Sequence, residues 1–411
     1  MLKAQLGLGK NPLRVEQDED GSVYELLGCW QKIRPMKSKQ QNLEKRILVI
    51  RNRYIGDTVL AIPFLRNLRK KYPDAIIDVL VEHGAGQILE ECPYKNELIV
   101  WNRQKGINDA FLKSFVNIVS MARWIRRRRY DQTFILNRSL STGLLAWLAG
   151  IPHRVGAVRD GRGMFLTRKV PLQKGRHEVE LSFDLLRAEG ITVDDGHNEN
   201  WMSESSIRKV DQLLASIPPE KPRVFISPQS SDSVRNWRTR HMADVLCWLI
   251  EEFGCEVFLC GSLADLDMHQ QLQQTLDSNV ASHVHDLSRK YSLGEASALL
   301  SRMDCCVGVD TGLPHVAASF GVPIVKICGQ TDQLQWRPWK TQSVLVQPTN
   351  HSNAVIDVTV DQVITAIQEL FHKADVWKKT SRRSIKKPVL RTDMYTKKEL
   401  ERLKAEKKGR R

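Results

Sequence analysis

The stretch CCVGVDTGLPHVAASFGVPIVKICGQTDQLQWRPW, from Cys305 to Trp339, decides the fold of this chain. Its opening apolar run, Cys305–Val309, is typical of a buried strand and is followed directly by Asp310. A helical pattern covers 315–320, a glycine and a proline end it, and 324–328 is a second apolar strand. Strand, polar turn, short helix and strand in this order predict a doubly wound α/β domain.

The polar turn after the first of these strands, Asp310-Thr311-Gly312, is the first candidate for a binding site. In doubly wound folds, ligands bind at the carboxyl ends of the strands, where helix N-termini offer free N–H groups to anions. A ligand that carries phosphate would therefore suit this turn. The same residues also suit an ordinary helix cap, in which Asp310 or Thr311 accepts backbone N–H bonds. The turn by itself leaves both interpretations open.

Composition restricts the class of protein. The 411 residues are enough for two domains, and 42% hydrophobic with 27% charged residues is typical of a soluble globular protein. No apolar run approaches the roughly 20 residues of a membrane-spanning helix, and the first residues lack the apolar core of a signal peptide. The eight cysteines show no zinc-type pairs, so we expect no metal site and a reducing, cytoplasmic location.

The positive charge of the chain is concentrated in its last segment. The net charge is +15, and 376–411 contains fifteen Lys or Arg against four acidic residues, a net of +11. We expect this tail to bind phosphates non-specifically, on a membrane surface or on nucleic acid. A dedicated nucleic-acid-binding protein is not favoured, because such proteins carry basic and aromatic residues together on a folded face.

The strand and helix patterns divide the chain into five parts. We predict an extension over 1–43, a Rossmann-like domain over 44–205, a linker over 206–222, a second Rossmann-like domain over 223–375, and the basic tail over 376–411. Two such domains would face each other across a cleft.

Each predicted domain carries polar residues where its strands end. In the first domain, the apolar strand 46–51 is followed by Gly56-Asp57 and by a helix that runs to Tyr72, for which Asp57 or Thr58 could be the cap. In the second domain they are Ser230, Ser231, Arg235, Asp265, Asp310, Thr311 and Gly312. Hydroxyls, a guanidinium and a helix N-terminus would form a cradle for a diphosphate, and a carboxylate on the other side could act as a base.

Four segments, in this order along the chain, resemble one known family. They are RILVIRNRYIGDTVLAIPFLRNLRKKYPDAIIDVLV, the weaker DQTFILNRSLSTGLLAWLAGIPHRVG, SPQSSDSVRNWRTRHMADVL and, most specific, VGVDTGLPHVAASFGVPIVKICGQTD. The chain from Arg46 to His372 is similar to the ADP-heptose:lipopolysaccharide heptosyltransferases, glycosyltransferase family 9, which have the GT-B fold of two facing Rossmann-like domains.

The resemblance implies a role for each candidate residue. Asp57 matches the aspartate taken as the general base, and Asp265 falls where an acidic residue holds the donor ribose. Arg235 stands where the family usually has a phosphate-binding lysine, a change that alters the geometry because Arg binds as a planar fork. The remaining donor-binding positions are Ser230, Ser231, Asp310, Thr311 and Gly312.

The implied activity is an inverting, metal-independent transfer of a heptose or related sugar from a nucleotide sugar to a lipopolysaccharide core or another surface glycan. No cofactor is implied; a donor resembling ADP-heptose is a substrate. Arg159 and Arg162 are candidates for binding an anionic glycolipid acceptor, with peripheral contact to the inner membrane. The alternatives are a relative that uses another nucleotide sugar on a different acceptor, or a non-catalytic nucleotide-sugar-binding protein.

Overall fold

The computed structural model describes residues 44–52, 54–101, 110–158, 161–329, 331–349 and 354–374. These residues belong to one compact unit, which begins at Glu44. The predicted extension 1–43 and the predicted tail 376–411 lie outside the described residues.

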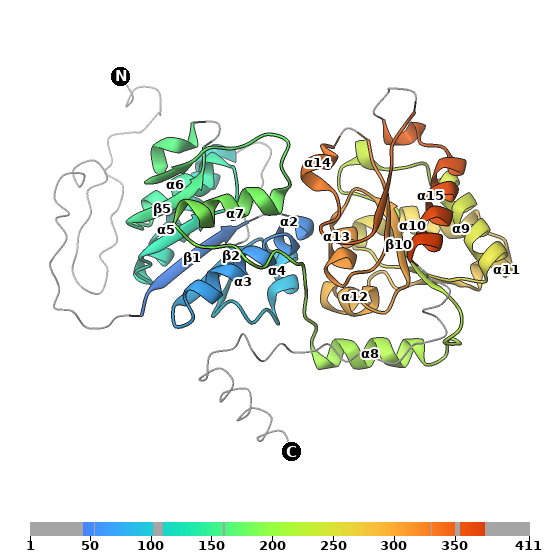
Figure 1. Cartoon of the computed structure of the whole chain (residues 1–411). Helices are drawn as coiled ribbons and strands as arrows, with labels where there is room; N and C mark the ends of the chain where they lie inside the picture. The colour runs from blue at the N-terminus through green and yellow to red at the C-terminus, as the bar shows by residue number, and fades with distance from the viewer. Residues whose placement is uncertain are drawn as a thin grey trace, which may run out of the picture. The chain divides into compact units, whose positions relative to one another are not determined.

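The first half of the described chain forms a parallel six-stranded sheet, sheet A, in the order β3-β2-β1-β4-β5-β6 (Figure 1). Its strands are β1 Arg46–Arg51, β2 Ile76–Val81, β3 Leu98–Val100, β4 Gln132–Ile135, β5 His153–Ala157 and β6 Arg168–Val170. The connecting helices are α2 Ile55–Val59, α3 Ile62–Lys71, α4 His83–Gly86, η1 Gln87–Leu89, α5 Ala110–Arg127, α6 Leu140–Leu148, η2 Arg162–Phe165 and α7 Glu178–Ala188.

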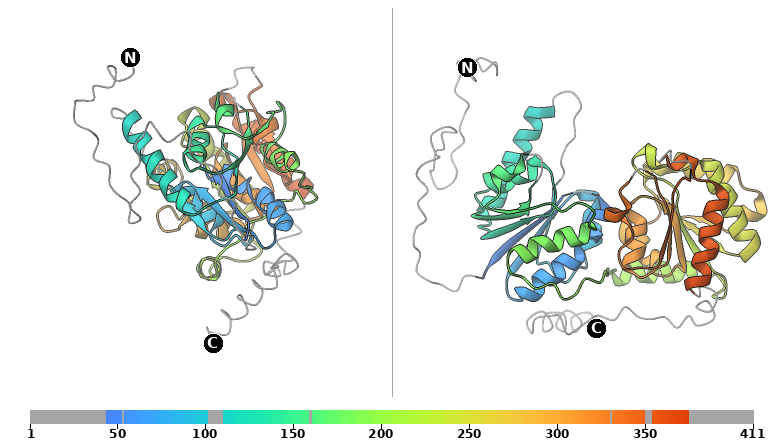
Figure 2. Two further views of the ribbon diagram at one scale, coloured as in Figure 1. Left: turned by 90° about the vertical axis from the view of Figure 1, so that its left-hand side faces the viewer. Right: turned by 45° about the horizontal axis from the view of Figure 1, so that its top comes forward.

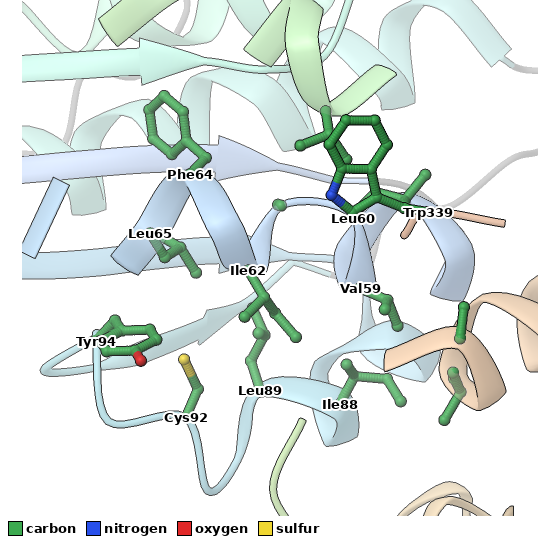
Figure 3. Close-up of a cluster of buried hydrophobic side chains, with 14 of the residues drawn as sticks. Val59, Leu60, Ile62, Phe64, Leu65, Ile88, Leu89, Cys92, Tyr94 and Trp339 are labelled. Carbon is green, nitrogen blue, oxygen red and sulfur yellow. The ribbon is translucent and has the colours of Figure 1, made fainter. Parts of the chain in front are cut away.

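Strand β1 shows why sheet A is covered on both faces. Successive side chains of a strand point to opposite faces, and in β1 both sets are apolar. Ile47 and Val49 pack with residues of α3 and α7, whereas Leu48 and Ile50 pack with residues of α5 and α6. Figure 3 shows part of the first of these clusters, where Phe64 of α3 lies among its neighbours.

The second half repeats the architecture as sheet B, in the order β12-β11-β10-β7-β8-β9. Its strands are β7 Arg223–Ser227, β8 Glu256–Leu259, β9 Val284–Asp286, β10 Cys305–Val309, β11 Ile324–Ile327 and β12 Ser343–Val346. Its helical segments are α8 Glu204–Leu214, η3 Ser233–Arg235, α9 Thr239–Phe253, η4 Leu263–Asp265, α10 Leu266–Gln274, α11 Ser278–Ala281, α12 Leu293–Leu300, α13 Gly312–Ser319, α14 Gln333–Trp336, η5 Val355–Asp357 and α15 Val360–Ala374.

These two parallel sheets confirm the predicted α/β class with two Rossmann-like halves. Helices α9 and α15 cover one face of sheet B, and α12 and α13 cover the other. The right-hand view of Figure 2 shows helices on both sides of each sheet. In the described part of the chain, no helix has the length and apolar content needed to cross a membrane.

The structure corrects the predicted helix between the first two strands. Instead of one helix, α2 and α3 follow each other, with a break at Leu60-Ala61 just before Pro63. Proline has no N–H and is favoured in the first turn, so it starts a new helix here. Helix α2 begins at Ile55, before Asp57, and its N-terminus has no side-chain cap. Both predicted caps, Asp57 and Thr58, are therefore wrong.

Candidate active site

The predicted site residues follow strands that lie next to each other. In sheet B, β7, β8 and β10 are adjacent, and the predicted donor-binding positions all follow their carboxyl ends. The chain moves from β7 outward to β9 and then returns to the other side of β7 at β10. This reversal is a topological switch point, where open α/β sheets leave a crevice for ligands. In sheet A the equivalent reversal lies between β1 and β4, and Asp57 follows β1.

The turn Asp310-Thr311-Gly312 does not form the side-chain cap that its sequence allows. Helix α13 begins at Gly312, and Thr311 at its N-cap position makes no side-chain capping bond. The Asp310 carboxylate instead pairs with the Lys326 ammonium of β11, with Nζ 2.7 Å from Oδ1. Burial acts to raise the pKa of Asp310, but Lys326 outweighs it and holds that pKa below its ordinary value. The ionised Asp310 thus lies just before α13, whose N-terminus has no side-chain cap.

Lys326 is the centre of this arrangement. Its side chain is fully buried in β11, and Nζ also donates to the carbonyl oxygen of Trp336 at 2.7 Å. The lysine thereby ties the turn after β10 to the loop after β11. His315, one turn into α13, is also buried. Burial and the nearby Lys326 charge lower the pKa of His315 to about 3, so its ring is neutral at physiological pH.

The loop after β7 presents a mixture of buried and exposed donors. Ser230 is buried, its backbone N–H donates to Asn236 Oδ1 at 2.7 Å, and its hydroxyl accepts from Asp232 N at 3.4 Å. Ser231 is exposed. Arg235 ends η3 with 40% of its side chain exposed, and its Nε lies 3.4 Å from Asp232 Oδ2. Arg235 therefore keeps guanidinium surface that an anion can reach.

Asp265, after β8, closes a capping box at the start of η4. Its Oδ2 accepts from the backbone N–H of Ser262 at 2.6 Å and from the Ser262 hydroxyl at 2.8 Å. Asp265 is half-buried and lies against Gly261, where an added Cβ would come within 2.7 Å of Asp265 Cβ. The Asp265 carboxylate thus holds this loop together, through hydrogen bonds to Ser262 of the same loop.

Asp57 belongs to a buried network of charges in sheet A. Arg51, the last residue of β1, places Nη2 3.0 Å from Asp57 Oδ1 and donates through Nε to the Asp57 carbonyl oxygen at 2.9 Å. The same guanidinium reaches Glu178 Oε1 at 3.1 Å, and Glu178 also pairs with Arg138. Arg51 thereby fixes both the carboxylate and the backbone of Asp57.

The two sequence motifs pack against each other through α2 and α13. A Cβ added at Gly312 would lie 2.7 Å from Ile55 Cβ, and a Cβ added at Gly56 would lie 2.8 Å from His315 Cδ2. The two helix starts approach each other so closely that both positions require glycine. Neither glycine has a positive φ, so the requirement comes from space and not from backbone conformation. This contact places the Gly56-Asp57 turn beside the Asp310-Thr311-Gly312 turn.

Further hydrogen bonds join the loop after β11 to the first half of the chain. His177 Nε2 donates to Arg337 O at 2.9 Å, and its ring packs against the Trp339 ring at a tilt of 31°, with centroids 4.4 Å apart. Gln335 Nε2 donates to Glu178 Oε2 at 2.8 Å. The loop that Lys326 anchors is thus also bonded to the charge network around Asp57.

Of the two predicted acceptor-binding residues, Arg162 and Arg159, the structure describes only the first. Arg162 is fully buried, and its guanidinium donates to the carbonyl oxygens of Asn137 and Ala157. It supports the loop after β5 and presents no surface to a ligand. Arg159 lies outside the described residues.

Sequence analysis missed Arg51, Glu178, Lys326 and His177. Lys326 had a detectable signal, because a lysine within the apolar strand IVKI must find a buried partner. No sequence signal indicated Glu178 or His177, since their partners Arg51 and Arg337 are far away in the sequence.

Comparison of the sequence with known proteins identifies its family. The family model described as glycosyltransferase family 9 (heptosyltransferase) matches residues 118–360. Lipopolysaccharide heptosyltransferase 3 of Escherichia coli K12 is 26% identical over 302 residues, which cover 71% of this chain and 85% of that protein.

Two solved structures have the same fold. The glycosyl transferase family 9 protein of Veillonella parvula aligns with a TM-score of 0.70 and 22% identity, over 81% of this chain and 99% of that one. The E. coli ADP-heptose lps heptosyltransferase II aligns with a TM-score of 0.68 and 24% identity, over 80% and 99% of the two chains.

Proposed function

Because the chain belongs to glycosyltransferase family 9, the heptosyltransferases, and is therefore a glycosyltransferase, we propose that it transfers a heptose or a related sugar from a nucleotide-sugar donor to a lipopolysaccharide core. The observation that carries this proposal is the packing of α2 against α13. It brings the turn that carries Asp57, after β1, next to the uncapped helix start after β10, and each turn lies by the switch point of its sheet.

We propose ADP-heptose as the donor. The name of a structural relative, E. coli ADP-heptose lps heptosyltransferase II, supports this donor, and the loops after β7, β8 and β10 offer suitable groups. The part-exposed Arg235 guanidinium, the Ser230 and Ser231 hydroxyls and the N-terminus of α13 would hold the diphosphate. Asp265 would leave its capping box to accept hydrogen bonds from the ribose hydroxyls.

In the proposed reaction, Asp57 takes the proton from an acceptor hydroxyl. The acceptor oxygen then attacks the anomeric carbon as the bond from that carbon to the diphosphate oxygen breaks, so the configuration is inverted in one step. The charge that develops on the departing diphosphate is stabilised by Arg235 and by the amides at the start of α13, with no metal ion in the scheme. Arg51 holds the Asp57 carboxylate in place throughout.

The variant Asp57→Asn tests the base. We expect it to bind ADP as tightly as the wild type and to lose at least about 100-fold in transfer, because general-base catalysis contributes roughly 10²–10⁴-fold. Calorimetry with ADP and a transfer assay in EDTA would measure the two effects, with Asp211→Asn on the exposed face of α8 as the matched control. Retained turnover in Asp57→Asn would refute the base assignment.

A panel of nucleotide sugars tests the donor in the same assay. Transfer from ADP-heptose alone supports the proposal. Transfer from another nucleotide sugar, or onto an acceptor unrelated to lipopolysaccharide, would favour the alternative specificity within the family.

A further inference from the structure

Helix α5 has an outward face that the other described residues leave exposed. Figure 1 shows α5 beside α6 on one face of sheet A. Its inward face is formed by Ile118, Ala122 and Ile125, which are buried against the sheet. The opposite face contains Val116, Val119, Arg123, Arg126 and Arg127, whose spacing places them along one side of the helix.

The two ends of this outward face differ in character. The amino-terminal half is apolar, with Val116 60% exposed and Phe115 38% exposed. The carboxy-terminal half carries the exposed arginines Arg123, Arg126 and Arg127. Helix α5 contains no acidic residue at all, so its surface charge is entirely positive.

The apolar half of α5 lies at the site edge of sheet A. Trp101, directly after β3, donates through Nε1 to Asn117 Oδ1 at 2.6 Å, so this part of α5 adjoins the carboxyl end of β3. At the other end, Arg128 Nη2 donates to Glu97 Oε1 at 2.9 Å, just before β3 begins. Because the strands are parallel, the carboxyl end of β3 shares its edge with the turn that holds Asp57.

Other exposed apolar side chains follow strands at the same edge. Leu140, at the start of α6, is 48% exposed, and Met164, in η2, is 73% exposed. Helix α6 contacts both α5 and η2, which makes α5, α6 and η2 neighbours along this edge. Exposed apolar residues that gather beside arginines on one side of a protein mark an interaction site rather than ordinary surface.

We propose that the outward face of α5 docks on an anionic phospholipid bilayer. Phe115 and Val116 enter the interfacial region, and Arg123, Arg126 and Arg127 contact the acidic headgroups with the helix lying obliquely on the surface. Apolar side chains combined with a purely cationic polar set are the signature of helices that lie on membranes. If the proposed function holds, this docking turns the Asp57 edge towards a lipid-anchored acceptor.

Vesicle co-sedimentation of the full chain tests the docking surface. The vesicles are phosphatidylcholine alone, and an equal mixture of phosphatidylcholine and phosphatidylglycerol. We expect the wild type to prefer the anionic vesicles, and Arg123→Gln with Arg126→Gln to weaken that binding roughly tenfold to thirtyfold, since each cation near an anionic surface contributes about fivefold. Phe115→Ser with Val116→Ser should weaken binding to both kinds of vesicle.

Matched controls carry the same changes elsewhere on the surface. Arg208→Gln with Arg240→Gln removes two exposed arginines of α8 and α9, and Ile356→Ser removes an exposed apolar side chain of η5. These controls should bind vesicles like the wild type. Equal binding by the α5 variants and the controls would overturn the proposal and assign membrane contact to another segment. Loss of duplex DNA binding with unchanged vesicle binding would assign the α5 face to nucleic acid instead.

A transfer assay separates this inference from the proposed function. The α5 variants should use a water-soluble, deacylated acceptor like the wild type and lose activity only on an acceptor embedded in anionic vesicles. A chain that docks as expected but transfers no sugar to either acceptor would refute the proposed function and leave the docking surface standing. Equal loss on both acceptors would show that the variants damage the fold and would overturn the docking role.

Discussion

Replacing Lys326 with methionine tests the buried ion pair on which the turn after β10 rests. Lys326 is fully buried, the Asp310 side chain is 6% exposed, and the two charges are 2.7 Å apart. Methionine keeps an unbranched apolar stem one atom shorter than lysine and removes the charge and the hydrogen bond to the Trp336 carbonyl oxygen. Asp310 is then left as a buried carboxylate without its cation.

The expected cost follows from this burial. Removing one partner of a buried ion pair destabilises a protein by about 3–5 kcal/mol, mainly because the remaining charge is uncompensated. We therefore expect Lys326→Met to lower the free energy of unfolding by about 3–5 kcal/mol at neutral pH. The matched control is Lys373→Met on α15, whose side chain is 62% exposed and should contribute less than about 1 kcal/mol.

The cost should depend on pH with a defined sign. In the wild type the pKa of Asp310 is lowered, so this residue contributes stability above its unfolded pKa and loses it as the pH falls through the folded value. Without Lys326, burial dominates and raises the pKa of Asp310 above its unfolded value. The difference between variant and wild type should therefore shrink as the pH falls, because protonation removes the unpaired charge.

Urea denaturation of both proteins across the acid range measures this difference. Adding Asp310→Asn to Lys326→Met should recover part of the lost stability at neutral pH, since the double variant leaves no buried charge at this position. A Lys326→Met protein within about 1 kcal/mol of the wild type, or one whose deficit stays constant with pH, would refute the assignment of a paired, ionised Asp310.

Two further residues give tests of the helix contact. The pKa of His315 is about 3 because of burial and the Lys326 charge, so the unfolded chain takes up a proton below its ordinary pKa of about 6.5 while the folded chain does not. Stability should thus fall by roughly 2 kcal/mol between about pH 7 and about pH 5 through this residue, and His315→Asn should show a shallower acid slope in the same denaturation series. Gly312→Ala places a Cβ 2.7 Å from that of Ile55 and should cost about 1–3 kcal/mol as an overpacked contact, whereas Gly84→Ala, with no atom within 4 Å, should be nearly neutral; equal melting temperatures for the two alanine variants would contradict the close approach of α2 and α13.

The α5 docking surface and the proposed reaction both use the same edge of sheet A. Both place functional groups at the carboxyl edge of sheet A, with Asp57 after β1 and the apolar start of α5 after β3. A parallel sheet directs all of its strand ends to one edge, so residues far apart in sequence collect there without contacting each other directly.

The sequence by itself determined the alternation of strands and helices, because continuous apolar runs such as Cys305–Val309 and Ile324–Cys328 form parallel strands buried on both faces. It also determined which turns hold the candidate site, since a strand that ends in Asp310-Thr311-Gly312 directs polar groups to the sheet edge. The family resemblance came from the order of these local segments along the chain.

Only the tertiary structure decided how the site is held together. The pairing of Lys326 with Asp310, the bonds from Arg51 to Asp57 and Glu178, and the close approach of Gly312 to Ile55 join segments that no local pattern connects. The tertiary structure also decided where helices begin and how they are capped, because Asp310 and Asp57 pair with buried cations instead of capping their own helices. A buried charge takes the partner that folding brings within reach, and that partner is fixed by packing rather than by neighbours in the sequence.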